Sequence, residues 1–231
     1  MARGIGRALQ RAVSREGLAE ESEGEGRGLA NARRRQVFRH LCLRPCARVG
    51  TMGRELSMSQ ANVRWHIWDL VENGYLQFEG ARVFPVGLID PEDAALFAVL
   101  ASAGRAEILT TVFQSPGTSL QELAERVQLT RQSASKIAQE LSEFGCLTTS
   151  DDGRYRRVYP TNALVRKREA NRERADAFSE ALLRRLAEEG LDPELLRREE
   201  TTFLVRFAGG SRKVVLEVPV DPYVTAWMRP G

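Results

Sequence analysis

The sequence predicts a mainly α-helical fold with small β-hairpins, built around an internal duplication. Residues 35–76 and 106–147 align without a gap when shifted by 71 positions, and their apolar, small and proline positions coincide. In each copy, three stretches with apolar residues at helical spacing precede an alternating stretch that is interrupted by a glycine-containing turn. A repeated unit of three helices and one hairpin accounts for these observations.

Local signals set the elements of the first copy. Pro45 ends its first helix, Ser59 is a suitable N-cap for its third helix, and Gly74 marks the end of that helix. Gly53 in the second helix leaves room for a neighbouring element to approach closely. The expected elements are helices over 33–43, 49–56 and 59–73 and a hairpin of residues 75–78 and 82–86.

The residues that mark the ends of the helices are clearer in the second copy. Ser119 and Glu122 have the spacing of a capping box, and Thr130 is the expected N-cap of the third helix. An additional helix before this copy is expected to begin at Asp90 and Pro91. The expected elements of the copy are helices over 105–113, from 118 or 119 onward and over 131–144, and a hairpin of residues 146–149 and 154–159.

Three helices followed by a hairpin define the winged helix-turn-helix. Residues 58–67, MSQANVRWHI, resemble the recognition helix of ArsR-like repressors, whereas residues 129–136, LTRQSASK, resemble the MarR-like type. Over residues 31–161 the chain resembles archaeal-type transcriptional regulators with two winged helix-turn-helix domains. The resemblance implies a regulator that binds double-stranded DNA.

Four parts are expected along the chain. Residues 1–18 carry four arginines and an apolar stripe, and a Gly- and Glu-rich linker follows them. Beyond the second copy, the pattern predicts one long helix over 162–189, a short helix to residue 198 and a hairpin whose apolar face needs a cover. The expected division is 1–30, a basic arm and linker; 31–89 and 90–161, two winged helix domains; and 162–231, a dimerisation or effector module.

Residues near the start of a recognition helix reach base edges, and wing residues reach phosphate or the minor groove. The candidate DNA-binding residues of the first domain are Ser59, Gln60, Asn62, Arg64 and Trp65 on the helix and Arg82 in the wing. Those of the second domain are Thr130, Arg131, Gln132, Ser133, Ser135 and Lys136 on the helix and Arg154, Arg156 and Arg157 in the wing.

Charge is uneven between the two copies. Residues 31–90 hold nine arginines against five acids, whereas residues 91–161 hold seven basic against nine acidic residues. We therefore expect the first domain to be the primary reader of DNA. A homodimer through the C-terminal helix and hairpin would present paired recognition helices to a palindromic site.

Other classes of function have less support in the sequence. It lacks the motifs of phosphate-cradling loops, nucleophile elbows and zinc proteases, so we expect no enzyme. Cys42, Cys46 and His40 fit no established zinc spacing, so neither a metal nor a cofactor is expected. No apolar stretch is long enough to cross a membrane, and a cytoplasmic, nucleoid-associated protein is expected.

Two alternatives to a sequence-specific regulator stay open. One is a winged-helix protein-interaction scaffold of the kind that organises chromosomes or accompanies polymerases. The other is a low-specificity chromatin protein. A small-molecule effector is left open and unidentified.

Overall fold

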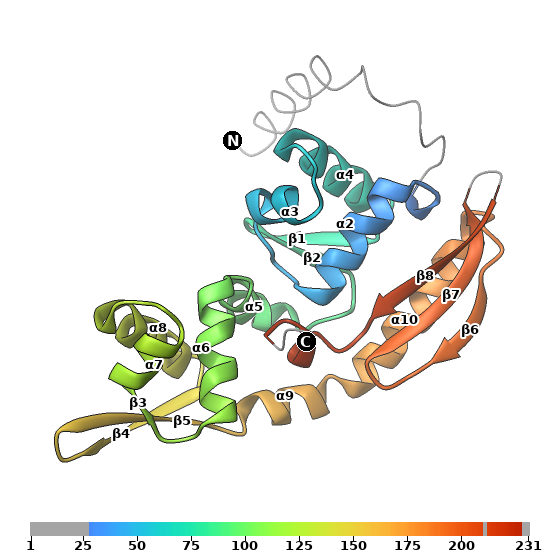
Figure 1. Ribbon diagram of the computed structural model, residues 1–231. Helices are drawn as coiled ribbons and strands as arrows, with labels where there is room; N and C mark the ends of the chain where they lie inside the picture. The colour runs from blue at the N-terminus through green and yellow to red at the C-terminus, as the bar shows by residue number, and fades with distance from the viewer. Residues whose placement is uncertain (1–27, 210–211, 228–231) are drawn as a thin grey trace.

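The computed structural model describes residues 28–209 and 212–227. Helices dominate, and three small antiparallel sheets accompany them, which confirms the predicted mainly α fold with small β-wings (Figure 1). The basic arm and most of the linker predicted for residues 1–30 lie outside the described residues.

The first copy folds as three helices and a two-stranded hairpin. A short 3-10 helix, η2, precedes them, and a turn of two residues joins the strands, since Glu79 pairs with Arg82. The apolar faces of the helices pack into one core around Phe38, Leu41 and Leu70. The elements are η2 (Gly28–Ala30), α2 (Ala32–Leu43), α3 (Val49–Glu55), α4 (Gln60–Glu72), β1 (Leu76–Glu79) and β2 (Arg82–Pro85).

The second copy repeats this order and adds a strand. β3 pairs with β5, so the wing belongs to a three-stranded sheet in the order β3-β5-β4. The additional helix expected at Asp90 is present as η3 and α5. The elements are η3 (Pro91–Asp93), α5 (Ala94–Leu100), α6 (Ala103–Gln114), β3 (Thr118–Ser119), α7 (Leu120–Arg126), α8 (Arg131–Glu143), β4 (Leu147–Asp152) and β5 (Tyr155–Pro160).

The C-terminal part differs from the sequence-based expectation at two places. The single long helix is two helices, because the chain breaks at the buried Asn171, whose side-chain amide donates to the Leu88 carbonyl at 3.0 Å. The short helix expected before residue 198 is instead a strand, β6, which pairs with β7. The elements are α9 (Ala163–Ala170), α10 (Arg172–Glu188), β6 (Glu194–Arg198), β7 (Thr202–Gly209), β8 (Arg212–Pro219) and α11 (Pro222–Thr225).

The apolar face of the C-terminal hairpin is covered by the same chain. Phe203, Val205 and Phe207 of β7 are buried, and the sheet packs beside α10 and beside α2 of the first copy (Figure 1). α9 runs from the second wing toward α10, and α11 lies near the centre, beside both α2 and α9 (Figure 1). The C-terminal part therefore packs against both copies.

Within residues 28–209 and 212–227, no single helix has the length and apolar character needed to cross a membrane. One bent pair, Pro91–Leu100 with Ala103–Gln114, meets the length and composition test only when the two helices are joined across their 91° bend.

Candidate nucleic-acid interface

The N-terminal half of α4 presents a polar face to solvent. The Ser59 hydroxyl accepts from the Asn62 backbone N–H at 3.1 Å, which confirms Ser59 as the N-cap. Gln60 and Arg64 are exposed one turn apart, and the Arg64 guanidinium donates to the Gln60 side-chain oxygen at 3.4 Å. This face offers one amide and one guanidinium, which are the groups that pair with adenine and guanine edges.

Trp65 is held at the side of α4 rather than projecting freely. The Arg34 guanidinium lies over the indole at 4.8 Å from the ring centroid, and Arg34 also forms an ion pair with Asp69 at 2.9 Å. The buried His66 ring meets the indole edge-on at 5.0 Å, and burial lowers the pKa of His66 to about 4. Contacts within the first copy therefore account for the position of Trp65.

Two exposed aromatic rings meet beside this polar face. Trp68 lies on α4 one turn beyond Arg64, and its ring centroid is 5.3 Å from that of Phe78 on β1. The two residues are 46% and 42% exposed. Sequence reasoning missed Phe78, because alternation alone does not distinguish it from a buried strand residue.

The first wing is short and carries little positive charge. Its strands have four residues each, and Arg82 is exposed at the start of β2. Glu79 is the cross-strand neighbour of Arg82 and partly offsets its charge. The wing therefore adds one arginine to the candidate interface of the first copy.

The exposed face of α8 is wholly polar near its N-terminus. Thr130 caps the helix, since its hydroxyl accepts from the Ser133 N–H at 3.1 Å and donates to the Ser133 hydroxyl at 2.8 Å. Ser135 is half-buried. Among the described residues, no ion pair engages either cation of this face. The exposed residues of the face are Thr130, Arg131, Gln132, Ser133 and Lys136.

The tip of the second wing extends away from the helices. Its strands have six residues each, and Arg154, Tyr155 and Arg156 are exposed around the turn. Arg156 has one carboxylate nearby, Asp151 at 3.8 Å, in a pair that is largely solvated. Sequence reasoning missed Tyr155, although it is the first residue of β5 after the turn, where a wing tip is expected.

Arg157 differs from the other wing arginines because its guanidinium is already bound. It donates to the Asp152 carboxylate at 2.6 Å and to the Gly117 carbonyl at 3.0 Å, and the hydrogen bond to Asp152 raises its pKa. Gly117 immediately precedes β3. Arg157 therefore ties β5 to the end of β4 and to the residue before β3.

Arg185, near the end of α10, contacts the residues that follow the end of α4. The Arg185 guanidinium donates to the Asn73 carbonyl at 2.5 Å and lies over the Tyr75 ring at 5.7 Å. Gly74 has a positive φ of +70°, and a Cβ at this position would lie 2.6 Å from the guanidinium. A cation at the C-terminus of a helix also opposes the negative end of the helix dipole. The orientation of α4 is thus tied to that of α10.

A buried polar cluster joins the second copy to the C-terminal part. The Asp93 carboxylate accepts from the Tyr223 hydroxyl at 2.6 Å and from the Lys167 ammonium at 2.5 Å. Burial raises the pKa of Tyr223. The three residues come from η3, α9 and α11, so the cluster fixes those elements relative to one another.

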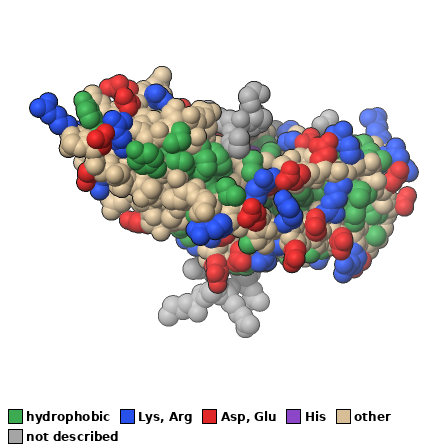
Figure 2. Space-filling model, turned by 90° about the horizontal axis from the view of Figure 1, so that it is seen from below, with side chains coloured by type: hydrophobic (Ala, Val, Ile, Leu, Met, Phe, Trp, Pro, Cys, Tyr) green, Lys and Arg blue, Asp and Glu red, His purple; other side chains and the backbone are tan. Residues whose placement is uncertain are grey.

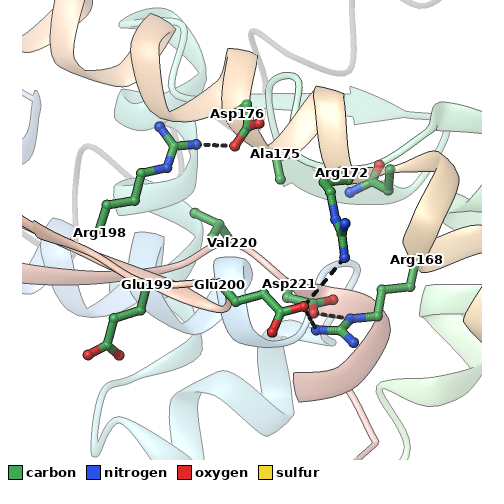
Figure 3. A pocket seen from close by; sticks show the side chains of 10 residues that line it. Arg168, Arg172, Ala175, Asp176, Arg198, Glu199, Glu200, Val220 and Asp221 are labelled. Carbon is green, nitrogen blue, oxygen red and sulfur yellow. Dashed lines mark hydrogen bonds and ion pairs between the residues drawn. The ribbon is translucent and has the colours of Figure 1, made fainter.

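A cavity of about 320 Å³ lies at the junction of α9, α10 and the C-terminal sheet (Figure 3). Its charged side chains bind one another: Arg168 donates to Asp221 at 2.5 Å and to Glu200 at 2.9 Å, and Arg198 pairs with Asp176. Arg172 is the least engaged cation, at 3.6 Å from Glu200. The face that includes α9 and α10 likewise alternates acidic and basic side chains (Figure 2).

Residues 28–209 and 212–227 contain no group of three or more His, Cys, Asp or Glu side chains suited to holding an ion. Cys42, Cys46 and Cys146 are buried free thiols. Burial raises the pKa of Cys46 to about 12 and that of Cys146 to about 11. Thiols of this kind are inert at neutral pH.

No model of a known protein family matches the sequence, and comparison with curated proteins finds no match. Among solved structures, the PcaV transcriptional regulator of Streptomyces coelicolor is 22% identical with a TM-score of 0.28, over 38% of this chain and 65% of that one. MepR of Staphylococcus aureus, a transcription regulator of the multidrug efflux pump MepA, is 17% identical with a TM-score of 0.27, over 38% and 64%. IdeR of T. acidophilum is 16% identical with a TM-score of 0.21, over 84% and 94%.

The matched region thus spans less than two thirds of the first two regulators. The TM-scores are too low to carry a function from these proteins to this one. The case for a function therefore depends on the residues of the candidate interface.

Proposed function

We propose that the protein is a transcription regulator that binds duplex DNA through two tandem winged helix-turn-helix domains, residues 31–89 and 90–161. The observation that carries the proposal is the second copy, in which a capped helix with Arg131, Gln132 and Lys136 exposed is followed by a long wing with Arg154 and Arg156 exposed. Side chains that pair with bases and side chains that bind phosphate are both available there.

The geometry favours the second domain as the main reader, whereas net charge favoured the first. On α4, Gln60 and Arg64 share the exposed face with Trp68 and Glu72. The first wing adds only Arg82, opposite an acidic neighbour. We propose that the first domain makes the secondary contact, through Ser59, Gln60, Asn62, Arg64, Trp65 and Arg82. The second domain makes the primary contact, through Thr130, Arg131, Gln132, Ser133, Ser135, Lys136, Arg154 and Arg156. Arg157 supports this contact by holding the wing through Asp152 and Gly117.

The proposal is tested by fluorescence anisotropy with labelled duplexes from a pool of genomic fragments, over a range of salt concentrations. Affinity should fall steeply with salt because bound phosphates release counterions. Arg156→Ala should weaken binding on all sequences and reduce the slope of log K against log salt by about 0.9. Gln132→Ala should instead relax sequence preference.

Arg166→Ala is the matched control for Arg156→Ala. Arg166 is exposed on α9, and no described residue forms an ion pair with it. The control removes the same charge outside the recognition helices and the wings, and it should leave both affinity and salt slope unchanged. Equal effects of the two substitutions, or duplex binding no tighter than millimolar at low salt, would contradict the proposal.

We further propose a homodimer through α10 and the C-terminal sheet in a cytoplasmic, nucleoid-associated protein. The hairpin face that suggested a dimer is buried within one chain, so the support shifts to β6. This edge strand is exposed along its length, including Leu195 and Leu196, and an exposed edge invites pairing with another strand. Light scattering on the wild type and on Leu195→Lys tests this interface: the variant should be monomeric.

A further inference from the structure

The first copy carries an exposed aromatic pair, which we call the aromatic surface: Trp68 and Phe78 with the flanking Glu72 and Glu79. A single exposed aromatic residue is ordinary in a folded protein, but two in contact form a continuous apolar patch. Here α4 and β1 each contribute one ring, so the patch is fixed by secondary structure rather than by a loop.

Charges of both signs flank the patch, since Arg64 lies one turn before Trp68 on α4 and Arg82 is the cross-strand neighbour of Glu79. Glu72 lies one turn beyond Trp68 on α4, and Glu79 follows Phe78 on β1. Both glutamates are exposed, and neither forms an ion pair with any of the residues that the structure describes. The surface therefore suits an occupant that presents an apolar side to the two rings.

We propose that the N-terminal segment of the same chain, residues 3–16, docks on the aromatic surface. The apolar residues of this segment recur every fourth position, which places them on one stripe of a helix. Its arginines also recur every fourth position and fall on the opposite stripe. The apolar stripe is Ile5, Leu9 and Val13, and the basic stripe is Arg3, Arg7, Arg11 and Arg15.

The chain that links this segment to η2 is long enough for docking, and it leaves the fold close to α4. Leu29 is buried, and Arg35 donates to the carbonyls of Leu29 and Ala30, so η2 fixes where the N-terminal segment leaves the fold. η2 contacts α4, and Gly28 lies against the Tyr75 ring just beyond the end of that helix. Residues 17–27 can span about 36 Å when extended, and a helix the length of α4 is only about 20 Å long.

Docking of the segment would change the charge of the face that carries the aromatic surface. The apolar stripe covers the rings of Trp68 and Phe78, and the opposite stripe then points four arginines away from the fold. The attraction to Glu72 and Glu79 is long-range, because the arginines lie on the far side of the docked helix. A face that is apolar and of mixed charge without the segment becomes basic with it.

The test measures trypsin cleavage after Arg7 and Arg11 in the full chain, followed by mass spectrometry, with no DNA present. Docking protects these sites, and cleavage follows the undocked population when opening is fast. Trp68→Ala removes most of the apolar contact and should speed cleavage by about tenfold. Val215→Ala, at an apolar residue of β8 that is 56% exposed, is the matched control and should leave the rate unchanged.

A second pair of variants changes the segment itself, so the folded part stays wild type. Leu9→Asn on the apolar stripe should speed cleavage as much as Trp68→Ala, and the double variant should be no faster than either single one. Ser14→Asn on the opposite stripe should have no effect. Cleavage rates that Trp68→Ala and Leu9→Asn leave unchanged would overturn the proposal. So would light scattering in which Trp68→Ala turns a dimer into a monomer, because the occupant would then be a second copy. Failure of duplex binding would leave this proposal intact, since the assay contains no DNA.

Discussion

Substitution by alanine should have opposite effects on the free energy of unfolding at the two glycines of α3, Gly50 and Gly53. A Cβ on Gly53 would lie 2.8 Å from the Met58 carbonyl oxygen, which is backbone and cannot rotate away. A Cβ on Gly50 would lie 3.5 Å from the end of the Gln60 side chain, which is ordinary contact. Alanine in place of glycine stabilises a helix by about 0.5–1 kcal/mol in both cases, so the difference between the two variants isolates the clash.

Overpacking of this kind costs about 1–3 kcal/mol. We expect Gly50→Ala to raise the free energy of unfolding by about 0.5 kcal/mol and Gly53→Ala to lower it by about 1–2 kcal/mol. Urea titration followed by circular dichroism measures both, and a constant m-value shows that the denatured state is unaffected. If Gly53→Ala proves as stable as Gly50→Ala, the turn between α3 and α4 does not approach as closely as the distance implies.

Three further predictions concern buried polar groups. Tyr223→Phe leaves part of the buried Asp93 carboxylate without a donor and should lower the free energy of unfolding by about 2 kcal/mol, whereas Tyr155→Phe at the exposed wing should change it little. Burial, reinforced by nearby arginines, lowers the pKa of His66 from 6.5 to about 4, so the unfolded chain binds the proton more tightly. Stability should therefore fall as pH drops from 6.5 toward 4, by up to about 1.4 kcal/mol per pH unit, and His66→Gln should flatten that part of the urea-midpoint profile. Burial raises the pKa of Cys46 to about 12, so iodoacetamide at pH 8 should modify this thiol only after denaturant is added. Mass spectrometry of the alkylated peptide measures the modification, and rapid labelling of the native protein would refute this prediction.

Features set by neighbours in sequence were predictable. Ser59 and Thr130 cap the helices they were expected to cap, and Ser119 and Glu122 form the capping box that their spacing indicates. Such signals work because a cap satisfies backbone N–H groups within one turn of the helix. The duplicated order of three helices and a hairpin follows from these caps, from the apolar periodicity and from Gly74.

Features set by distant contacts were not predictable. Residues 194–198, ELLRR, favour a helix by composition, but pairing with β7 makes them a strand. The break between α9 and α10 at Asn171 depends on a hydrogen bond to Leu88, 83 positions earlier. In the candidate interface, sequence reasoning counted Arg157 with the other wing arginines, although contacts with Asp152 and Gly117 engage its guanidinium.

The place of α11 bears on how the protein is made. Thr225 donates to the Leu43 carbonyl, 182 positions earlier, and the Trp227 carbonyl accepts from the Thr110 hydroxyl, 117 positions earlier. A ribosome releases the two helix-and-hairpin copies well before it releases these residues. Each copy can therefore form on emergence, but the surfaces that α11 covers stay open to solvent and to chaperones until synthesis has passed residue 227. Closing the fold therefore waits for residues that follow both copies in the chain.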